Sequence, residues 1–223
     1  MPPEPFRVAF VPGVTPDKWA RTWAERLPRL PLELLPVGEA EQESVLYEGR
    51  AAMCFLRLPA DRDRLHVIPL YEEQPVVVAP KGHFVEAADE VTLEDLAGEH
   101  LLAAPPLTTG QAVETVAAGT GIIVVPLSVA RLHHRKDVVH RPVVDLPTTQ
   151  VGLAWLRSGT TTEQDELLEV FIGIVRGRRA TSSRGPTGEQ STSKAKPAGA
   201  KPRPARTERR KAAPPRRGGS RRR

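Results

Sequence analysis

The side chains that could do chemistry form no catalytic or metal-binding set in this sequence. His133 and His134 are adjacent, so on a helix they point about 100° apart and cannot chelate one ion together. Glu72 and Glu73 are neighbours in a strand region, so they should face opposite sides of the strand. Gly119-Thr120-Gly121 lacks the lysine and the spacing of a phosphate-binding loop. We therefore expect no enzyme activity, no metal and no cofactor.

The cysteine and hydropathy pattern indicates a cytoplasmic protein. The single cysteine, Cys54, lies in the apolar run 51–56, which predicts a buried thiol and excludes an internal disulfide. The N-terminus has no basic start leading into a long apolar run, as a signal peptide would. No stretch approaches the ~18 apolar residues of a membrane span. We expect a soluble protein with no membrane partner.

Charge is distributed unevenly along the chain. Of the 32 Lys+Arg and 27 Asp+Glu, residues 176–223 hold 17 basic and two acidic side chains, a net charge of +15. Residues 1–175 keep 15 basic and 25 acidic side chains, a net charge of −10. Residues 180–223 lack aromatic side chains and large aliphatic ones, so nothing there can offset the entropy of ordering. We predict an acidic globular part, residues 1–179, with a disordered basic tail, residues 180–223.

The basic tail predicts contact with DNA or RNA. Clusters of arginine and lysine separated by proline and glycine neutralise phosphates with little readout of bases. The alternative is a tail that only solubilises the protein or meets its own acidic part. The side chains predicted to contact nucleic acid are Arg176, Arg178, Arg179, Arg203, Arg209, Arg210, Lys211, Arg216, Arg217, Arg221, Arg222 and Arg223.

Residues 116–132, VAAGTGIIVVPLSVARL, are the most informative stretch for the fold. The stretch predicts a helix end, a turn at 119–121, a strand at 122–125 and a second helix at 127–132. Four consecutive β-branched residues without polar alternation are typical of a strand buried on both faces. A buried strand with a helix on each side indicates part of a doubly wound α/β sheet, and an ordinary core strand without a site is the plainer interpretation.

Other segments repeat this alternation of strand and helix. In the first part of the chain the order is strand, helix, strand, helix, strand, which implies parallel strands joined by crossovers. Thr15 or Asp17 is the expected cap of the first helix, whose Trp19 and Trp23 should face the sheet. The expected strands are 6–11, 32–37, 51–56, 66–70, 76–79, 101–104, 138–144 and 150–156, and the expected helices are 17 to about 30, 39–48, 111–118 and 163–175.

Two segments of this sequence resemble one known family. Residues 116–132 are similar to the pattern VAAGxGxxxxPxSxAxxL of the effector-binding (substrate-binding) domain of LysR-type transcriptional regulators. Upstream, residues 69–80 (PLYEEQPVVVAP), then His83, then residues 91–102 (VTLEDLAGEHLL) resemble that family's strand pair and following segment, in the same order.

The resemblance implies an α/β fold of two lobes, like type 2 periplasmic binding proteins. Lobe I would comprise about 1–68 and 148–179, and lobe II about 69–147. Between the strand at 101–104 and the helix at 111–118 the family usually carries a further helix and strand, so lobe II here should be shortened. The family's DNA-reading helix-turn-helix would precede the effector domain, yet the first expected strand begins at residue 6, so we expect a chain without that module.

The resemblance also implies a binding site for a small effector, often an organic acid, between the lobes. The threonines at this site precede helices whose free N–H groups favour an anion, although each threonine could simply cap its helix. Carried over from the family, the site residues are Gly13, Val14 and Thr15, then Leu107, Thr108 and Thr109, and Pro126.

Two interpretations of the function remain at this point. The first is a transcription-associated domain that binds a small effector, contacts nucleic acid through its tail and pairs with a second copy, as the family often does. The alternative is a degenerate module for protein interaction or dimerisation that senses no ligand, which the short second lobe favours.

Overall fold

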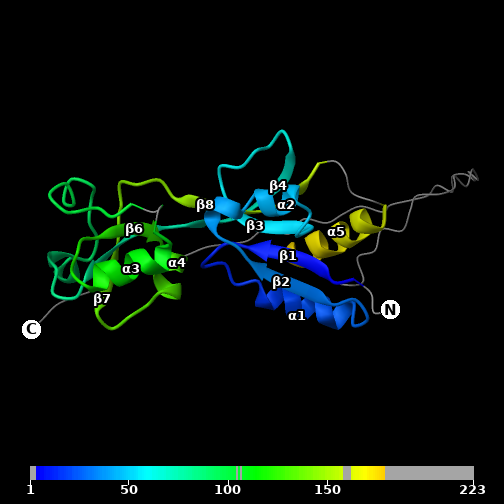
Figure 1. The fold of residues 1–223 in the computed structure, drawn as a ribbon, viewed down its shortest axis with the longest axis horizontal. Coiled ribbons are helices and arrows are strands. Elements are labelled where there is room, and N and C mark those ends of the chain that lie inside the picture. The colour runs from blue at the N-terminus through cyan, green and yellow to red at the C-terminus, as the bar shows by residue number, and fades with distance from the viewer. Residues whose placement is uncertain (1–3, 104, 106, 158–161, 179–223) are drawn as a thin grey trace, which may run out of the picture. The chain divides into compact units, whose positions relative to one another are not determined.

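A computed structural model describes residues 4–103, 105, 107–157 and 162–178 (Figure 1). These residues belong to one compact unit of the chain, residues 1–183. A second unit, residues 184–223, lies outside the described part, so the disorder predicted for 180–223 stays a prediction. None of the helices in the described ranges is long and apolar enough to cross a membrane.

The first sheet has five strands in the order β2-β1-β3-β8-β4. β1 lies parallel to both β2 and β3, as the alternation of strand and helix predicted. β8 returns from the other end of the chain and pairs antiparallel with β3 and β4. The strands are β1 (Phe6–Phe10), β2 (Leu32–Pro36), β3 (Met53–Arg57), β4 (Leu65–Glu73) and β8 (Thr149–Leu156).

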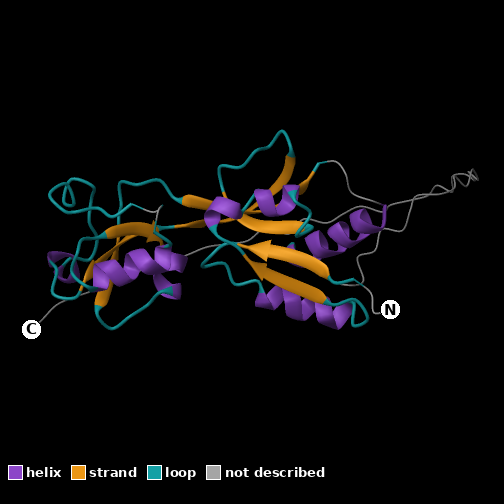
Figure 2. Cartoon of the chain, viewed as in Figure 1, coloured by secondary structure: helices purple, strands orange, loops and turns teal. Residues whose placement is uncertain are grey.

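Helices cover both faces of this sheet (Figure 2). On one face α1 (Asp17–Arg26) and α5 (Thr162–Val175) pack on an aromatic core. Trp23 stacks on Phe6 with ring centroids 4.8 Å apart, and Trp19 stacks on Phe55 at 4.6 Å. The predicted tryptophan stripe is therefore confirmed. The other face packs against α2 (Ser44–Tyr47).

The second sheet has three strands, β6-β5-β7, all antiparallel. β5 (Pro75–Pro80) is central, with β6 (Ile123–Pro126) and β7 (Val138–Pro142) at the edges. On one face of the sheet α3 (Thr109–Ala117) and α4 (Leu127–Leu132) contribute to a hydrophobic cluster; on the other, the short helix η2 (Phe84–Ala87) contributes Val85 to a second cluster.

The stretch 116–132 forms the helix end, strand and second helix that were predicted, but its strand pairs with a different kind of neighbour than expected. Ile123 and Val125 enter one core cluster and Val124 packs on the other, so both faces of β6 meet apolar side chains. However, β6 is an edge strand antiparallel to β5, so the predicted doubly wound parallel sheet is wrong here. A run of β-branched residues encodes burial on both faces but carries no information about strand direction.

Three other elements also differ from the sequence prediction. The acidic helix predicted at 39–48 is split into a 3₁₀ turn, η1 (Glu39–Glu41), and α2. The first helix ends at Arg26 instead of about 30, and its N-cap is Pro16, so neither Thr15 nor Asp17 caps it. Over residues 101–103 of the strand predicted at 101–104, the structure shows only an isolated bridge between Leu101 and Ile122, and the side chain of Leu101 is exposed.

The two sheets meet where β4 leads into β5. Pairing between β4 and β8 extends to Glu73, which lies opposite Thr149. Gln74 is thus the link from the first sheet to the second on this side.

Candidate functional site

A buried arginine lies at the junction of the two lobes. Arg57, the last residue of β3, is 6% exposed. Its Nε donates to Glu73 Oε2 at 2.8 Å, and its Nη1 donates to Glu39 Oε1 at 2.6 Å. Its Nη2 donates to the Pro12 carbonyl at 2.8 Å and to Ser128 Oγ at 3.2 Å. These contacts use four of the five N–H donors of a guanidinium.

The partners of Arg57 come from distant parts of the chain. Pro12 follows β1, Glu39 begins η1, Glu73 ends β4, and Ser128 is in the first turn of α4. Ser128 belongs to the second lobe, whereas the other three belong to the first. Arg57 is therefore a direct hydrogen-bonded link between the lobes.

Glu73 and its neighbour Glu72 face opposite sides of β4, as predicted. The Glu73 side chain is 4% exposed and pairs with Arg57. Glu72 is exposed and accepts a hydrogen bond from the Thr148 hydroxyl at 2.8 Å. The other Glu73 oxygen, Oε1, is buried and has no hydrogen-bond partner among the described residues. Negative charge at the junction is therefore only partly compensated.

Gly13 brings the lobes into direct contact. Its φ of +89° lies in the left-handed region, and a Cβ added there would clash with Ser128 Oγ and lie 3.0 Å from the Ser128 carbonyl carbon. Only glycine can adopt this φ and leave room for Ser128 without strain. The loop after β1 therefore abuts the first turn of α4.

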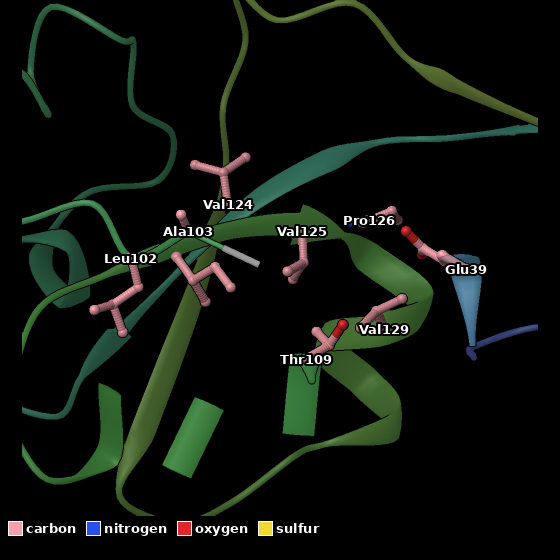
Figure 3. Close-up of a pocket in the computed structure, with 9 residues that line it drawn as sticks. Glu39, Leu102, Ala103, Thr109, Val124, Val125, Pro126 and Val129 are labelled. Carbon is pink, nitrogen blue, oxygen red and sulfur yellow. The ribbon is translucent and has the colours of Figure 1, made fainter. Parts of the chain in front are cut away.

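A cavity of about 300 Å³ lies beside this junction (Figure 3). Glu39 lines it from the first lobe, and Thr109, the first residue of α3, lines it from the second. Among the described lining residues Glu39 is the one with an ionisable side chain. The other lining residues have apolar side chains and come from the second lobe: Leu102, Ala103, Ile123, Val124, Val125, Pro126 and Val129.

The structure brings two of the predicted site residues, Thr109 and Pro126, into the cavity lining. Thr108 is the N-cap of α3: its hydroxyl accepts from Gln111 N, and the Gln111 side chain bonds back to Thr108 N at 2.9 Å. The capping role considered for Thr108 is therefore confirmed. Leu107 packs at the edge of the second-lobe core.

The predicted residues after β1 are placed differently from those of the second lobe. Gly13 lies at the contact between the lobes, as described above. Val14 is 3% exposed and belongs to the aromatic core of the first lobe. Thr15 is exposed and does not cap α1. None of these three is in the described cavity lining.

Sequence reasoning missed Arg57 and Glu39. Arg57 directly follows the apolar run 51–56, and a charged side chain that ends a buried strand was a usable signal. Glu39 was predicted only as the first residue of the helix expected at 39–48. The break between η1 and α2, which places Glu39 next to Arg57, left no clear mark in the sequence.

Cys54 is fully buried, and burial raises the pKa of its thiol to about 12, which confirms the buried unreactive thiol. Within the part of the chain that the structure describes, no group of three or more His, Cys, Asp or Glu side chains is placed to hold a metal ion.

Two of the arginines predicted to contact nucleic acid lie in the part of the chain that the structure describes. Arg176 and Arg178 are exposed just past the C-terminus of α5, where Gly177 has a φ of +70°. Arg178 N donates to the Gly173 carbonyl at 2.8 Å and Gly177 N to the Ile174 carbonyl at 3.0 Å, the pattern of a Schellman cap. The other predicted residues, Arg179 and those from Arg203 to Arg223, lie outside the described part.

The two-lobed fold is that of a regulatory domain of the LysR type. Residues 3–114 match the family described as the LysR substrate binding domain, and the chain belongs to that family. The proteins of this family are regulators of transcription whose domains of this type bind small effectors.

A known relative agrees with this assignment. The transcriptional regulator AlsR of Bacillus subtilis (strain 168) is 22% identical over 181 residues, which cover 69% of this chain and 59% of AlsR. The chain thus spans somewhat over half the length of that relative.

Solved structures show the same fold. The regulatory domain of OxyR from Pseudomonas aeruginosa superposes with a TM-score of 0.63 at 21% identity, covering 78% of this chain and 97% of that domain. The effector binding domain of BenM with its effector benzoate superposes with a TM-score of 0.59 at 22% identity, covering 79% of this chain and 95% of that domain.

Proposed function

We propose that this domain binds a small effector in the cavity between its lobes and thereby takes part in the regulation of transcription. The observation that carries the proposal is a cavity of about 300 Å³ that Glu39 lines from one lobe and Thr109 and Pro126 line from the other. The structural likeness to the BenM domain, which is described with benzoate, supports a ligand of similar size. We assign no catalytic step to the chain.

A ligand in this cavity would act on the arrangement of the lobes. Apolar side chains such as Val125 and Val129 would bury the body of the ligand, while Glu39 and Thr109 supply polar contacts from different lobes. A ligand that contacts both lobes stabilises the arrangement in which those contacts are made, by its differential affinity for that arrangement. This is the physical basis on which binding could control an attached or associated regulatory module.

A fragment screen with the full-length chain tests the proposal. Thermal shift and calorimetry with small phenyl, cyclohexyl and butyl compounds should give hits that stabilise the fold, because a ligand of the native state raises its stability by mass action. The variant Ala103→Phe places a large side chain at an exposed lining position and should abolish the hits while leaving the protein folded. Ala87→Phe, at an exposed position outside the lining, is the matched control. Hits that survive Ala103→Phe would place the ligand elsewhere and contradict the proposal.

We also propose that the basic tail contacts DNA or RNA without sequence specificity. The support is the net charge of +15 over residues 176–223. Binding that depends on phosphate neutralisation weakens steeply with salt. Replacing Arg209, Arg210 and Lys211 together with Arg216 and Arg217 by glutamine in the full chain should lower affinity and flatten the salt dependence. Equal binding by this variant would assign the contact to another surface.

The alternative function, a module for protein interaction without a ligand, has one observation in its favour. Arg57 already links the lobes through its hydrogen bond to Ser128, so the junction holds together without an effector. In that case no compound in the fragment screen would bind at the cavity, and the function would depend on contact with another protein. Pairing of two copies and a cytoplasmic location remain predictions from the sequence and the family.

A further inference from the structure

We propose that the cavity selects a ligand with an apolar body and one ammonium group, and that it disfavours carboxylates. Glu39 would be the residue that binds the ammonium group. The inference depends on the proposed function, because it names the chemical class of the effector. It also reverses the sequence-based expectation of an organic acid.

The formal charges at the junction give the first argument. Glu39 and Glu73 are two carboxylates that share one guanidinium, Arg57, with Nη1–Oε1 and Nε–Oε2 distances of 2.6 and 2.8 Å. The three groups together leave one negative charge, and Glu73 Oε1 is buried without a partner. A carboxylate entering the cavity beside Glu39 would face like charge, which disfavours its ionised form, whereas an ammonium group would balance the cluster.

The hydrogen bonds of Arg57 give the second argument. A carboxylate ligand is usually held by an arginine that offers two parallel N–H groups. Here both Nη2 hydrogens are used by Pro12 O and Ser128 Oγ, and Nε and Nη1 each donate to a glutamate. No lysine, arginine or histidine is among the described residues that line the cavity. The arginine at the junction is therefore not available to clamp an acid.

Glu39 has the geometry that an ammonium group needs. Its carboxylate lies at the edge of the cavity next to Pro126 (Figure 3). The side chain is 49% exposed, and the hydrogen bond from Arg57 involves Oε1. A carboxylate has about four lone-pair sites, so a second donor can bind without displacing Arg57. Val125 and Val129 line the same cavity and would contact the apolar body.

The N-terminus of α3, in contrast, favours an anionic ligand. A helix N-terminus carries a partial positive charge of roughly half an elementary charge, which favours anions. The capping box of Thr108 and Gln111 already occupies two of the donors there. The partial positive charge of the helix N-terminus, already partly satisfied, does not outweigh the net negative charge of the Glu39, Arg57 and Glu73 cluster, so the cavity should prefer a cation.

A matched series of ligands tests this proposal. Binding of benzylamine, benzyl alcohol and benzoate to the full-length chain is measured by calorimetry, with cyclohexyl and butyl analogues of each. We expect the amines to bind about ten-fold or more tighter than the acids, the size of an effect typical of a hydrogen bond to a charged group. Glu39→Gln should remove this preference. Glu41→Gln, at an exposed acid of the same turn outside the described lining, is the matched control and should leave it unchanged.

The outcomes separate this inference from the proposed function. Acids that bind more tightly than amines, with binding lost in Ala103→Phe, would overturn the inference and leave effector binding in place. An amine preference that survives Glu39→Gln would also overturn the inference. Binding by no member of the series, whatever its charge, would contradict the proposed function itself and the inference with it.

Discussion

Arg57 Nε donates to Glu73 Oε2 at 2.8 Å, and the two side chains are only 6% and 4% exposed. The residues end β3 and β4, two strands that are not neighbours, because β8 lies between them in the sheet. Glu73 therefore helps to hold Arg57 in the position from which it reaches Ser128 in the other lobe. Burying two charges is costly, and the mutual contact offsets that cost only while both partners are present.

Removal of Glu73 should destabilise the fold strongly. Glu73→Ala leaves a buried guanidinium with one carboxylate fewer, and loss of one partner of a buried pair costs about 3 kcal/mol in unfolding free energy. Chemical denaturation measures this value. Glu72→Ala, at the exposed neighbour, should cost at most about 1 kcal/mol because exposed polar contacts contribute little. Equal costs for the two variants would show that the Arg57–Glu73 pair does not stabilise the fold.

Gly13 should tolerate substitution much less well than Gly49. Both have positive φ, +89° and +67°, so alanine at either position pays a left-handed penalty of about 1 kcal/mol. At Gly13 the added Cβ also meets Ser128, whereas at Gly49 nothing lies within 4 Å. Denaturation should therefore show that Gly13→Ala costs about 2 kcal/mol more than Gly49→Ala. Similar costs would mean that the lobes do not touch at Gly13.

Thr108 and Thr109 should differ in their effect on stability. Thr108→Ala removes the hydroxyl that caps α3 and should cost about 1 kcal/mol. Thr109 is the first residue of α3, does not cap it and lines the cavity, so Thr109→Ala should have a small effect on stability and a larger effect on ligand binding. Denaturation and calorimetry on the same pair of variants separate the two roles. A Thr109→Ala protein that is as unstable as Thr108→Ala would contradict this division.

Stability should fall in mildly acidic solution because of His140. Burial, and then the charges of His134 and nearby arginines, hold the pKa of His140 below its usual 6.5. The unfolded chain then binds a proton more readily than the folded one, so stability is present above pH 6.5 and is lost as pH falls toward the folded pKa. His140→Gln should flatten this part of the profile of unfolding free energy against pH. An unchanged slope would show that another group controls it.

Cys54 should be unreactive in the folded protein. With its thiol buried and its pKa raised to about 12, almost no thiolate is present near neutral pH. A chromogenic disulfide reagent at pH 8 should label Cys54 only as fast as the protein unfolds, and addition of denaturant should make labelling immediate. Rapid labelling of the native protein would contradict the packing around β3.

The sequence was sufficient for the parts of the fold that depend on local hydrophobic pattern. The runs that became β1, β2 and β3, and the tryptophans of α1, were recognisable because their apolar side chains are buried in or pack against the core of the first lobe. The direction of β6 was not predictable, because Ile123–Pro126 is equally apolar in either orientation. Arg57 was missed because its partners lie up to 71 residues away, and such contacts exist only after folding.

The central claim is that a small molecule binds in the cavity beside Arg57 and Glu39. The most direct test is a methyl NMR titration of the full-length chain, with labelled leucine and valine, against the amine, alcohol and acid series. We expect saturable shifts at Leu102, Val125 and Val129, which line the cavity, and little change at Val8 in the core of the first lobe. Absence of saturable shifts at the cavity methyls, or shifts confined to other sites, would contradict the claim.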